Sequence, residues 1–291
     1  MGKMIYLDNA ATTKTAPEVV EAMLPYFTEF YGNASTVYDF AANSKAAIAK
    51  GRQQIADVIG AKKEEIYFTA GGSESDNWAL KATFEAYKSK GNHIITTKIE
   101  HHAILHTCDY LASRGYEITY IDVDENGVIK LDQLKAAIRP DTILISVMFA
   151  NNEIGTLQPI GEIGAICREN GIPFHTDAVQ AAGHVPLDVQ ALSVDLLSLS
   201  AHKFHGPKGI GALFARKGTP ISSLLEGGAQ ERGKRPGTEN LPAIMGMAAA
   251  LSEACQKMDR HAAAVSALRD RLIEKLSRIP HSRLNGDRNQ R

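Results

Sequence analysis

The sequence predicts an α/β fold in which a mainly parallel sheet of seven strands lies between layers of helices. From residue 66 onward, short β-rich apolar runs alternate with longer segments that have the spacing of amphipathic helices. Such apolar runs are typical of strands that are buried on both faces. Ligands of these sheets bind outside the carboxyl ends of the strands, so the residues that follow each strand are the first candidates for a functional site.

The order of the elements follows from this alternation. Seven runs are expected to be strands, at residues 66–68, 93–97, 117–121, 142–149, 172–175, 195–199 and 209–215. Helical spacing occupies residues 73–89, 103–113, 131–138 and 160–169. Two helices are expected before the sheet, one entered at Pro17 and one at about residues 37–59, and one long helix after it, from Leu241 to near Pro280.

The composition excludes several classes of protein. Hydrophobic residues at 44% and charged residues at 22% are ordinary for a globular chain. A net charge of -1 provides no basic surface for nucleic acid or an anionic membrane, so neither partner is expected. Residues 1–13 lack the apolar core of a secretory signal, and no apolar run approaches the ~18 residues of a membrane span. Cytoplasmic localisation is therefore expected.

The three cysteines, Cys108, Cys167 and Cys255, fit neither a disulfide framework nor a CxxC motif. A reducing compartment is the expectation that follows. Free cysteine is often buried, so all three are expected to serve packing.

A glycine-rich turn follows the first strand. Gly71 and Gly72 allow a close backbone approach, Ser73 can cap or donate, and the helix that follows presents free N–H groups to an anion. The segment is either a phosphate cradle or a capped turn without a ligand.

Two other glycine-rich segments imitate nucleotide motifs. Residues 228–235 match the P-loop pattern until Arg235, which replaces the required Ser or Thr. Residues 206–211 lack the GxGxxG spacing and precede a strand instead of following one. We interpret both as turns.

Asp177 and Lys203 each stand at the carboxyl end of a predicted strand. A carboxylate in that position is costly without a cationic partner, and a protonated pyridine nitrogen is one partner that fits. A lysine amine that has lost part of its solvation can attack carbonyls. Together with a phosphate cradle, this pair is the combination that a pyridoxal phosphate site requires.

Eight motifs, in order, resemble the cysteine desulfurase family, which comprises fold-type I, pyridoxal-phosphate-dependent enzymes of the class V aminotransferase group. They are YLDNAATT at residues 6–13, GGSESDN at 71–77, EHH at 100–102, NNEIG at 151–155, HTDAVQ at 175–180, SAHK at 200–203, GPKGIG at 206–211 and RPGT at 235–238. The resemblance implies an N-terminal arm at residues 1–15, a cofactor-binding large domain at 16–250 and the start of a small domain at 251–291.

The resemblance also implies roles for individual residues. Lys203 would hold the cofactor as a Schiff base and shuttle protons, Asp177 would pair with the pyridinium nitrogen, and His101 would stack on the ring and transfer protons. Asn152 and Gln180 resemble the groups that contact the ring and its phenolic oxygen. The set that resembles the phosphate-binding residues is Gly72, Ser73, Ser200 and His202, with Thr238 reaching the phosphate from the neighbouring subunit of a homodimer.

The implied reaction takes sulfur from L-cysteine, giving alanine and an enzyme persulfide for a sulfur acceptor or scaffold protein in iron–sulfur cluster or thio-cofactor assembly. The family's nucleophilic cysteine and a carboxylate-binding arginine follow the Asn-Gly-Asp at residues 285–287, and the chain stops at Arg291. The interpretation favoured here is a chain truncated before that loop. The alternatives are a catalytically incomplete pyridoxal phosphate protein that serves as a binding partner, and a related lyase or aminotransferase.

The remaining polar residues support weaker hypotheses. His102 and His106 have a metal-ligand spacing, but no third ligand is evident, so no metal is expected. His205 is ambiguous between loop packing and substrate contact. Arg232 and Arg235 can bind an anion or remain solvated.

Overall fold

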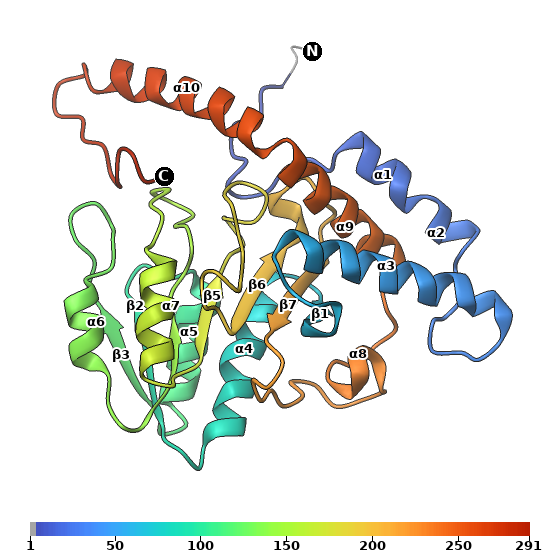
Figure 1. Cartoon of the computed structure of the whole chain (residues 1–291). Coiled ribbons are helices and arrows are strands. Elements are labelled where there is room, and N and C mark those ends of the chain that lie inside the picture. Colours follow the sequence, from blue (N-terminus) through green and yellow to red (C-terminus); the bar gives the residue numbers. More distant parts are fainter. Residues whose placement is uncertain (1–3) are drawn as a thin grey trace.

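The computed structural model describes residues 4–291 and contains a seven-stranded sheet surrounded by helices (Figure 1). The strand order is β1-β7-β6-β5-β4-β2-β3. The strands are β1 (Ile66–Thr69), β2 (His93–Thr97), β3 (Glu117–Ile121), β4 (Thr142–Ser146), β5 (Phe174–Asp177), β6 (Leu196–Ser200) and β7 (Gly211–Ala215). This confirms the predicted α/β class.

The sheet is mainly parallel, as predicted. The β2–β3, β2–β4, β4–β5 and β5–β6 pairs are parallel, whereas β7 runs antiparallel to both of its neighbours, β1 and β6. The carboxyl ends of β1, β2, β4, β5 and β6 therefore meet at one edge of the sheet.

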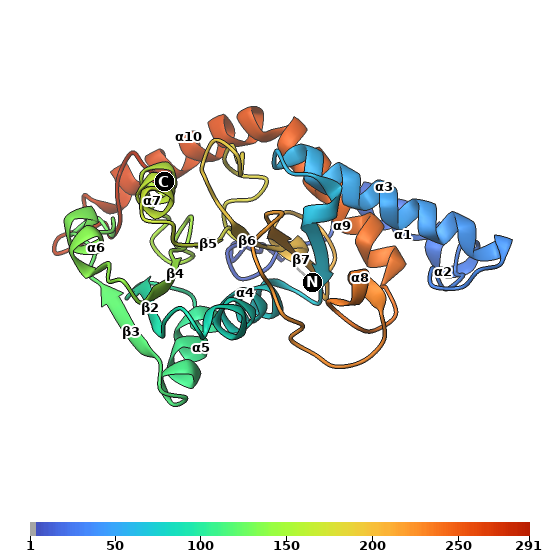
Figure 2. The same cartoon turned by 60° about the horizontal axis from the view of Figure 1, so that its bottom comes forward.

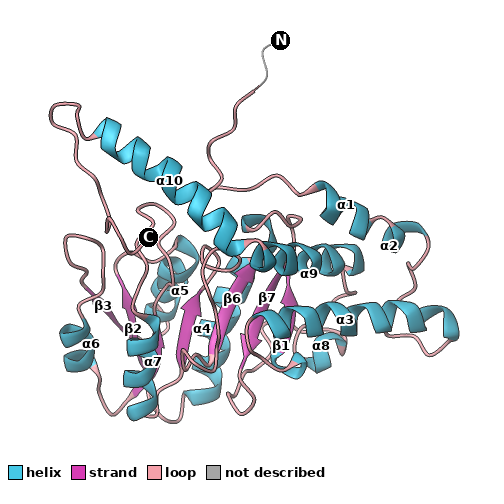
Figure 3. Ribbon diagram, turned by 45° about the horizontal axis from the view of Figure 1, so that its top comes forward, coloured by secondary structure: helices cyan, strands magenta, loops and turns pink. Residues whose placement is uncertain are grey.

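Helices cover both faces of the sheet (Figure 2). Helices α4 (Gly72–Tyr87) and α5 (His102–Ala112) pack on one face, and α3 (Ala42–Val58), α7 (Ile160–Glu169) and α9 (Leu241–Gln256) on the other. The remaining helices are α1 (Pro17–Met23), α2 (Pro25–Thr28), α6 (Leu131–Ala137), α8 (Gln230–Gly233) and α10 (Met258–Leu276). Figure 3 shows the strands running between these layers.

Alternation along the strands divides the core into two clusters. Ile94 and Leu196 face α4 and α5, while Ile95 and Leu197, one position further along, belong to the opposite cluster. Successive side chains of a strand point to opposite faces, so apolar residues at consecutive positions fill both layers. Trp78 of α4 is completely buried and anchors the smaller cluster.

The N-terminal segment crosses the carboxyl edge of the sheet. The N–H of Thr13 donates to the carbonyl of His202 at 2.9 Å, and the N–H of Ala16 donates to the carbonyl of His205 at 3.0 Å. These bonds fix residues 8–13 over the loop that carries Lys203.

Several predicted boundaries differ from the structure. The strand expected at residues 142–149 ends at Ser146, and helix α3 begins at Ala42, after a 3-10 turn at Asp39–Ala41. The single long helix expected after Leu241 is wrong, because the chain breaks at Lys257 into α9 and α10. No glycine or proline marks that break. The backbone turns where buried residues give way to a helix with none.

Two further points concern the organisation of the chain. The boundary expected at residues 250–251 falls inside α9, so the domain division stays a prediction. Within residues 4–291, every helix is too short or too polar to cross a membrane.

Candidate active site

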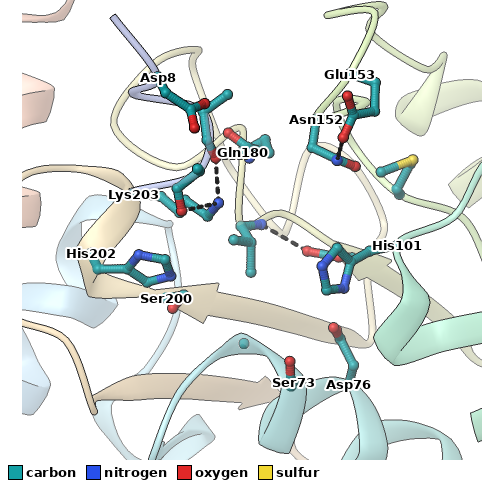
Figure 4. Close-up of a pocket in the computed structure, with 16 residues that line it drawn as sticks. Asp8, Ser73, Asp76, His101, Asn152, Glu153, Gln180, Ser200, His202 and Lys203 are labelled. Carbon is teal, nitrogen blue, oxygen red and sulfur yellow. Dashed lines mark hydrogen bonds between the residues drawn. The ribbon is translucent and has the colours of Figure 1, made fainter. Parts of the chain in front are cut away.

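A cavity of about 600 Å³ opens at the carboxyl edge of the sheet (Figure 4). Nine of the ten residues predicted for the site line it: Gly72, Ser73, His101, Asn152, Asp177, Gln180, Ser200, His202 and Lys203. The tenth, Thr238, is exposed and lies outside this lining. The other lining residues are Asp8, Ala10, Ala11, Asp76, Met148, Glu153 and Val179.

The N-terminus of α4 forms one wall. No side chain caps this helix, so the N–H groups of its first turn remain available to an anion. A Cβ at Gly72 would lie 2.6 Å from Cγ2 of Val179, so only glycine allows the helix to start this close to the β5 loop. A hydrogen bond of 2.8 Å between the hydroxyls of Thr69 and Ser75 braces the turn.

Lys203 stands in the 3-10 turn that follows β6. Its Nζ donates to the carbonyl of Ala10, and to the carbonyl of Ala11 at 3.0 Å. Burial lowers the pKa of the amine, and the charges of Asp177, Asp8 and Glu153 oppose that shift. A lower pKa increases the neutral, nucleophilic fraction of the amine.

Asp177 closes β5 at the floor of the cavity and is 6% exposed. Its Oδ1 accepts a hydrogen bond of 2.9 Å from the N–H of Val179. Burial raises the pKa of this carboxyl, while the Val179 N–H, His101 and Lys203 lower it. The neighbours of Asp177 thus include a cationic group, the amine of Lys203, as its position required.

His101 caps the N-terminus of α5. Its Nδ1 accepts a hydrogen bond of 3.1 Å from the N–H of Ala103. Because Nδ1 is the acceptor, the proton of the neutral ring resides on Nε2. His101 therefore presents an N–H donor.

Amide and imidazole groups complete the rim. Nε2 of Gln180 donates to the carbonyl of Ala10 at 3.0 Å, and Nδ2 of Asn152 donates to Oε1 of Glu153 at 2.8 Å. Nδ1 of His202 lies 3.0 Å from the hydroxyl of Thr12. The Gln180 and His202 contacts tie the N-terminal segment to the loops after β5 and β6.

Two buried carboxyls beneath the cavity received no role in the sequence analysis. Oε1 of Glu100 accepts hydrogen bonds from the Thr97 hydroxyl at 2.6 Å and from the Met148 N–H at 3.0 Å. Burial raises the pKa of Glu100 to about 8. Asp76, on α4, is 1% exposed, and its Oδ1 has no hydrogen-bond partner. Asp76 lies in the GGSESDN motif and Glu100 in the EHH motif. An acidic residue at a position expected to face the core could have identified both.

The rings of His102 and His106 stack with centroids 5.0 Å apart. In residues 4–291, the one group of His, Cys, Asp and Glu that is close enough to share a metal ion is Asp76, His101 and Asp177, within the cavity. His102 and His106 thus acquire no third ligand.

The cysteines lie away from the cavity. Cys108 and Cys167 are buried, and burial raises the pKa of the Cys108 thiol to about 12. Burial also raises the pKa of Cys167 and of Cys255, which is half-buried on α9. The raised pKa values favour the protonated, less nucleophilic form of all three thiols.

The arginines and the glycine-rich loop also lie outside the lining. Arg235 pairs with Glu74 at 2.9 Å, and Arg232 covers the Tyr67 ring and donates to the carbonyl of Ile66 at 2.8 Å. No residue of the loop at 227–237 lines the cavity. His205 also lies outside the lining: its backbone N–H donates to the Thr13 hydroxyl, and its ring Nδ1 lies 3.1 Å from the carbonyl of Lys14.

Pyridoxal phosphate fits these groups. An uncapped helix N-terminus with the Ser73, Ser200 and His202 side chains suits a phosphate, and a buried carboxylate suits a pyridinium nitrogen. An amine of lowered pKa in the same cavity suits the aldehyde.

Comparisons with known proteins agree with this chemistry. The aminotransferase class-V family matches residues 5–291. "Cysteine desulfurase IscS" of Methanosarcina thermophila is 57% identical over 289 residues, which cover 99% of this chain and 72% of that protein. "Putative cysteine desulfurase IscS 1" of Bacillus subtilis is 51% identical over 255 residues, covering 88% and 67%.

Solved structures show the same relationship. A structure titled "NIFS-LIKE PROTEIN" superposes with a TM-score of 0.93 at 41% identity, covering 94% of this chain and 76% of that one. A structure titled "SspA in complex with cysteine" has a TM-score of 0.83 at 42% identity, covering 85% and 72%. The chain therefore belongs to the class-V aminotransferases and, within them, to the cysteine desulfurases, which are pyridoxal-phosphate-dependent transferases.

Proposed function

We propose that this chain binds pyridoxal 5'-phosphate in the cavity around Lys203 and acts on L-cysteine. The observation that carries the proposal is the placement of Lys203 and Asp177 in one cavity, opposite the uncapped N-terminus of α4. The substrate is supported by the SspA structure, which was solved with cysteine at 42% identity to this chain.

Different residues would hold different parts of the cofactor. Lys203 would hold the aldehyde carbon, and Asp177 would pair with the ring nitrogen. Asn152 and Gln180 would contact the ring and its phenolic oxygen. The phosphate would be bound by Gly72, Ser73, Ser200 and His202, with Thr238 contributed by a second copy of the chain. When bound, pyridoxal phosphate supplies an electron sink for bonds at the substrate Cα and Cβ.

Two side chains can move protons. The Lys203 amine, with its pKa lowered by burial, can take a proton from the substrate Cα. The Nε2–H of His101 is a donor because Nδ1 is engaged by Ala103. Asp177 would keep the ring nitrogen protonated, because a buried carboxylate is stabilised by a cation nearby, and the Val179 N–H fixes its position.

The proposed reaction conserves all atoms. An acceptor thiol takes the sulfur of L-cysteine, the C–S bond breaks, and Cβ gains a proton, so the products are alanine and a persulfide. The three cysteines of this chain are away from the cavity. A sulfur-acceptor protein or scaffold for iron–sulfur cluster or thio-cofactor assembly is the proposed destination.

Assembly and compartment follow the same proposal. Thr238 is exposed on the chain alone, which suits a residue that works in the site of a homodimer partner. We assign residues 16–250 to the cofactor-binding domain and 251–291 to the start of a second domain. Three free cysteines suit the reducing cytoplasm.

The test is the visible absorption of the chain after incubation with pyridoxal phosphate. We expect a bound-cofactor band that L-cysteine perturbs, and we expect Lys203→Ala to lose it while circular dichroism stays unchanged. Lys208→Ala is the matched control, because Lys208 is exposed and lies outside the cavity lining. Retention of the band in Lys203→Ala would contradict the assignment. Alanine formation with an added small thiol tests the sulfur-transfer half.

A further inference from the structure

Three buried carboxyls lie at or beneath the floor of the cavity: Asp76, Glu100 and Asp177 are 1%, 6% and 6% exposed. Carboxylate oxygens of Asp76 and Asp177 and a ring nitrogen of His101 all lie within 4.8 Å of one another. Figure 4 shows Asp76 rising from α4 toward His101. Two carboxyls this close in a buried site cannot both ionise without a large electrostatic cost, so they share one charge.

The hydrogen bonds decide which carboxyl keeps the charge. Asp177 accepts a hydrogen bond from the Val179 N–H at 2.9 Å, and His101 and Lys203 favour its ionised form. Oδ1 of Asp76 has no partner. A buried carboxylate with fewer donors and no cation beside it is the less stable ion.

Histidine 175 does not supply the missing cation. Its Nε2 lies 3.7 Å from Oδ1 of Asp76, but its two ring nitrogens already contact the hydroxyls of Ser146 and Ser198, at 2.9 and 3.0 Å. Burial lowers the pKa of His175 to about 3, so the ring is neutral. Burial and the charge of Asp177 raise the pKa of Asp76, which the Ser198 hydroxyl only partly opposes.

The titratable groups that face Asp76 come from two places. Strand β5 contributes His175 and Asp177, and the loop that leads into α5 contributes Glu100 and His101. Glu100 adds a further like charge when ionised. Strand β6 contributes the Ser198 hydroxyl, the Ser146 hydroxyl of β4 contacts His175, and β7, with the sequence GALFA, has no titratable side chain.

We propose that Asp76 is a positioning residue of the cofactor site: it holds the proton that the two carboxyls share, so that Asp177 keeps the negative charge. This inference rests on the proposed function only in assigning Asp177 to the cofactor ring. The proton itself belongs to the chain without cofactor, so it can be tested separately.

The first test is infrared difference spectroscopy of the full chain without cofactor at neutral pH. Relative to wild type, Asp76→Asn should lose the C=O stretching band of a protonated carboxyl. Loss of carboxylate bands alone would overturn the proposal. Thr83→Val, a second buried polar position on α4 whose hydroxyl lacks a partner, is the matched control and should lose no carboxyl band.

The second test asks whether the charge of Asp177, or burial alone, keeps Asp76 protonated. In Asp177→Asn the neighbouring charge is gone, so the Asp76 band should titrate at least about one pH unit lower than in wild type. An unchanged midpoint would mean that Asp76 does not share a proton with Asp177, and the positioning role would be wrong.

The third test uses the dissociation constant of pyridoxal phosphate. Asp177→Asn should bind at least about tenfold more weakly than wild type, because it loses a charged hydrogen bond, and Asp76→Asn, which removes no charge, should weaken binding by a smaller factor. Equal weakening by both substitutions would show that Asp76 carries the charge and would overturn the proposal. If wild type does not bind the cofactor, the proposed function fails, while the infrared result still stands.

Discussion

Buried charge is handled in opposite ways at the β1 edge and beneath the cavity. At the β1 edge, Arg52 and Glu231 form two hydrogen bonds of 2.6 Å, Arg52 also donates to the carbonyl of Ile66, and Glu231 accepts from the N–H of Phe68. Beneath the cavity, Asp76 and Glu100 each bury an oxygen without a partner. Complete pairing compensates the buried charges, whereas incomplete pairing favours the protonated form of a buried carboxyl.

The paired region also fixes a strained loop. Glu231 and Arg232 adopt φ angles of 46° and 59°, in the left-handed region that side chains other than glycine rarely occupy. Such a conformation persists only when its surroundings hold it. The ion pair with Arg52 therefore anchors the glycine-rich loop to β1.

The largest effect is expected when the ion pair of Arg52 and Glu231 is broken. Arg52→Met leaves Glu231 buried without a cation, which should lower the free energy of unfolding by about 3–5 kcal/mol. Urea denaturation measures it. Adding Glu231→Gln should recover part of the loss, because the uncompensated charge is removed. A single-variant loss no larger than that of Lys98→Met, at the exposed pair with Asp122, would contradict the comparison.

The second largest effect concerns Glu100, whose contribution to stability should depend on pH. Glu100 has a pKa of about 8 in the folded chain against an ordinary value of 4.5, so its protonated form is fully stabilising below about pH 4.5. That contribution is lost as pH rises toward 8, by up to about 1.4 kcal/mol per pH unit. Glu100→Gln should therefore gain about 2–3 kcal/mol on wild type between about pH 5 and pH 7.

Thermal or urea unfolding across this pH range measures the difference. The control is Glu64→Gln, at an exposed position, which should run parallel to wild type. A Glu100→Gln curve that also ran parallel to wild type would show that Glu100 ionises normally in the folded chain.

The smallest effect is expected at the ion pair of Arg235 and Glu74, which lies between the two regions. Arg235 and Glu74 join the glycine-rich loop to the start of α4, with side chains 23% and 17% exposed. Partial exposure screens the pair, so Arg235→Met should cost about 1 kcal/mol of unfolding free energy. If Arg235→Met lost as much unfolding free energy as Arg52→Met, solvent exposure would not explain the difference between the two ion pairs.

Much of the site could be predicted because the ends of apolar strands can be recognised from the sequence. Asp177 and Lys203 each close or follow an apolar run, and parallel strands bring such positions to one edge. Asp76 was not predicted, because a polar residue on an amphipathic helix is usually solvated and the pattern does not say which turn faces a cavity.

Two other features could not be predicted from the sequence, for different reasons. The carbonyls of Ala10 and Ala11 hold Lys203, but a backbone acceptor has no residue signature. The break at Lys257 has no glycine or proline, so periodicity continued across it. There, buried residues of α9 give way to α10, which has none.

The sequence by itself determined the α/β class, the parallel sheet and the motifs of the cysteine desulfurase family, because these depend on local apolar patterns and on residue types in order. The tertiary structure decided which charges are paired. Arg52 and Glu231 are 179 residues apart, and Asp76 and Asp177 are about a hundred apart. The energy of a buried charge depends on the partners within a few ångströms, and only the fold brings those partners together.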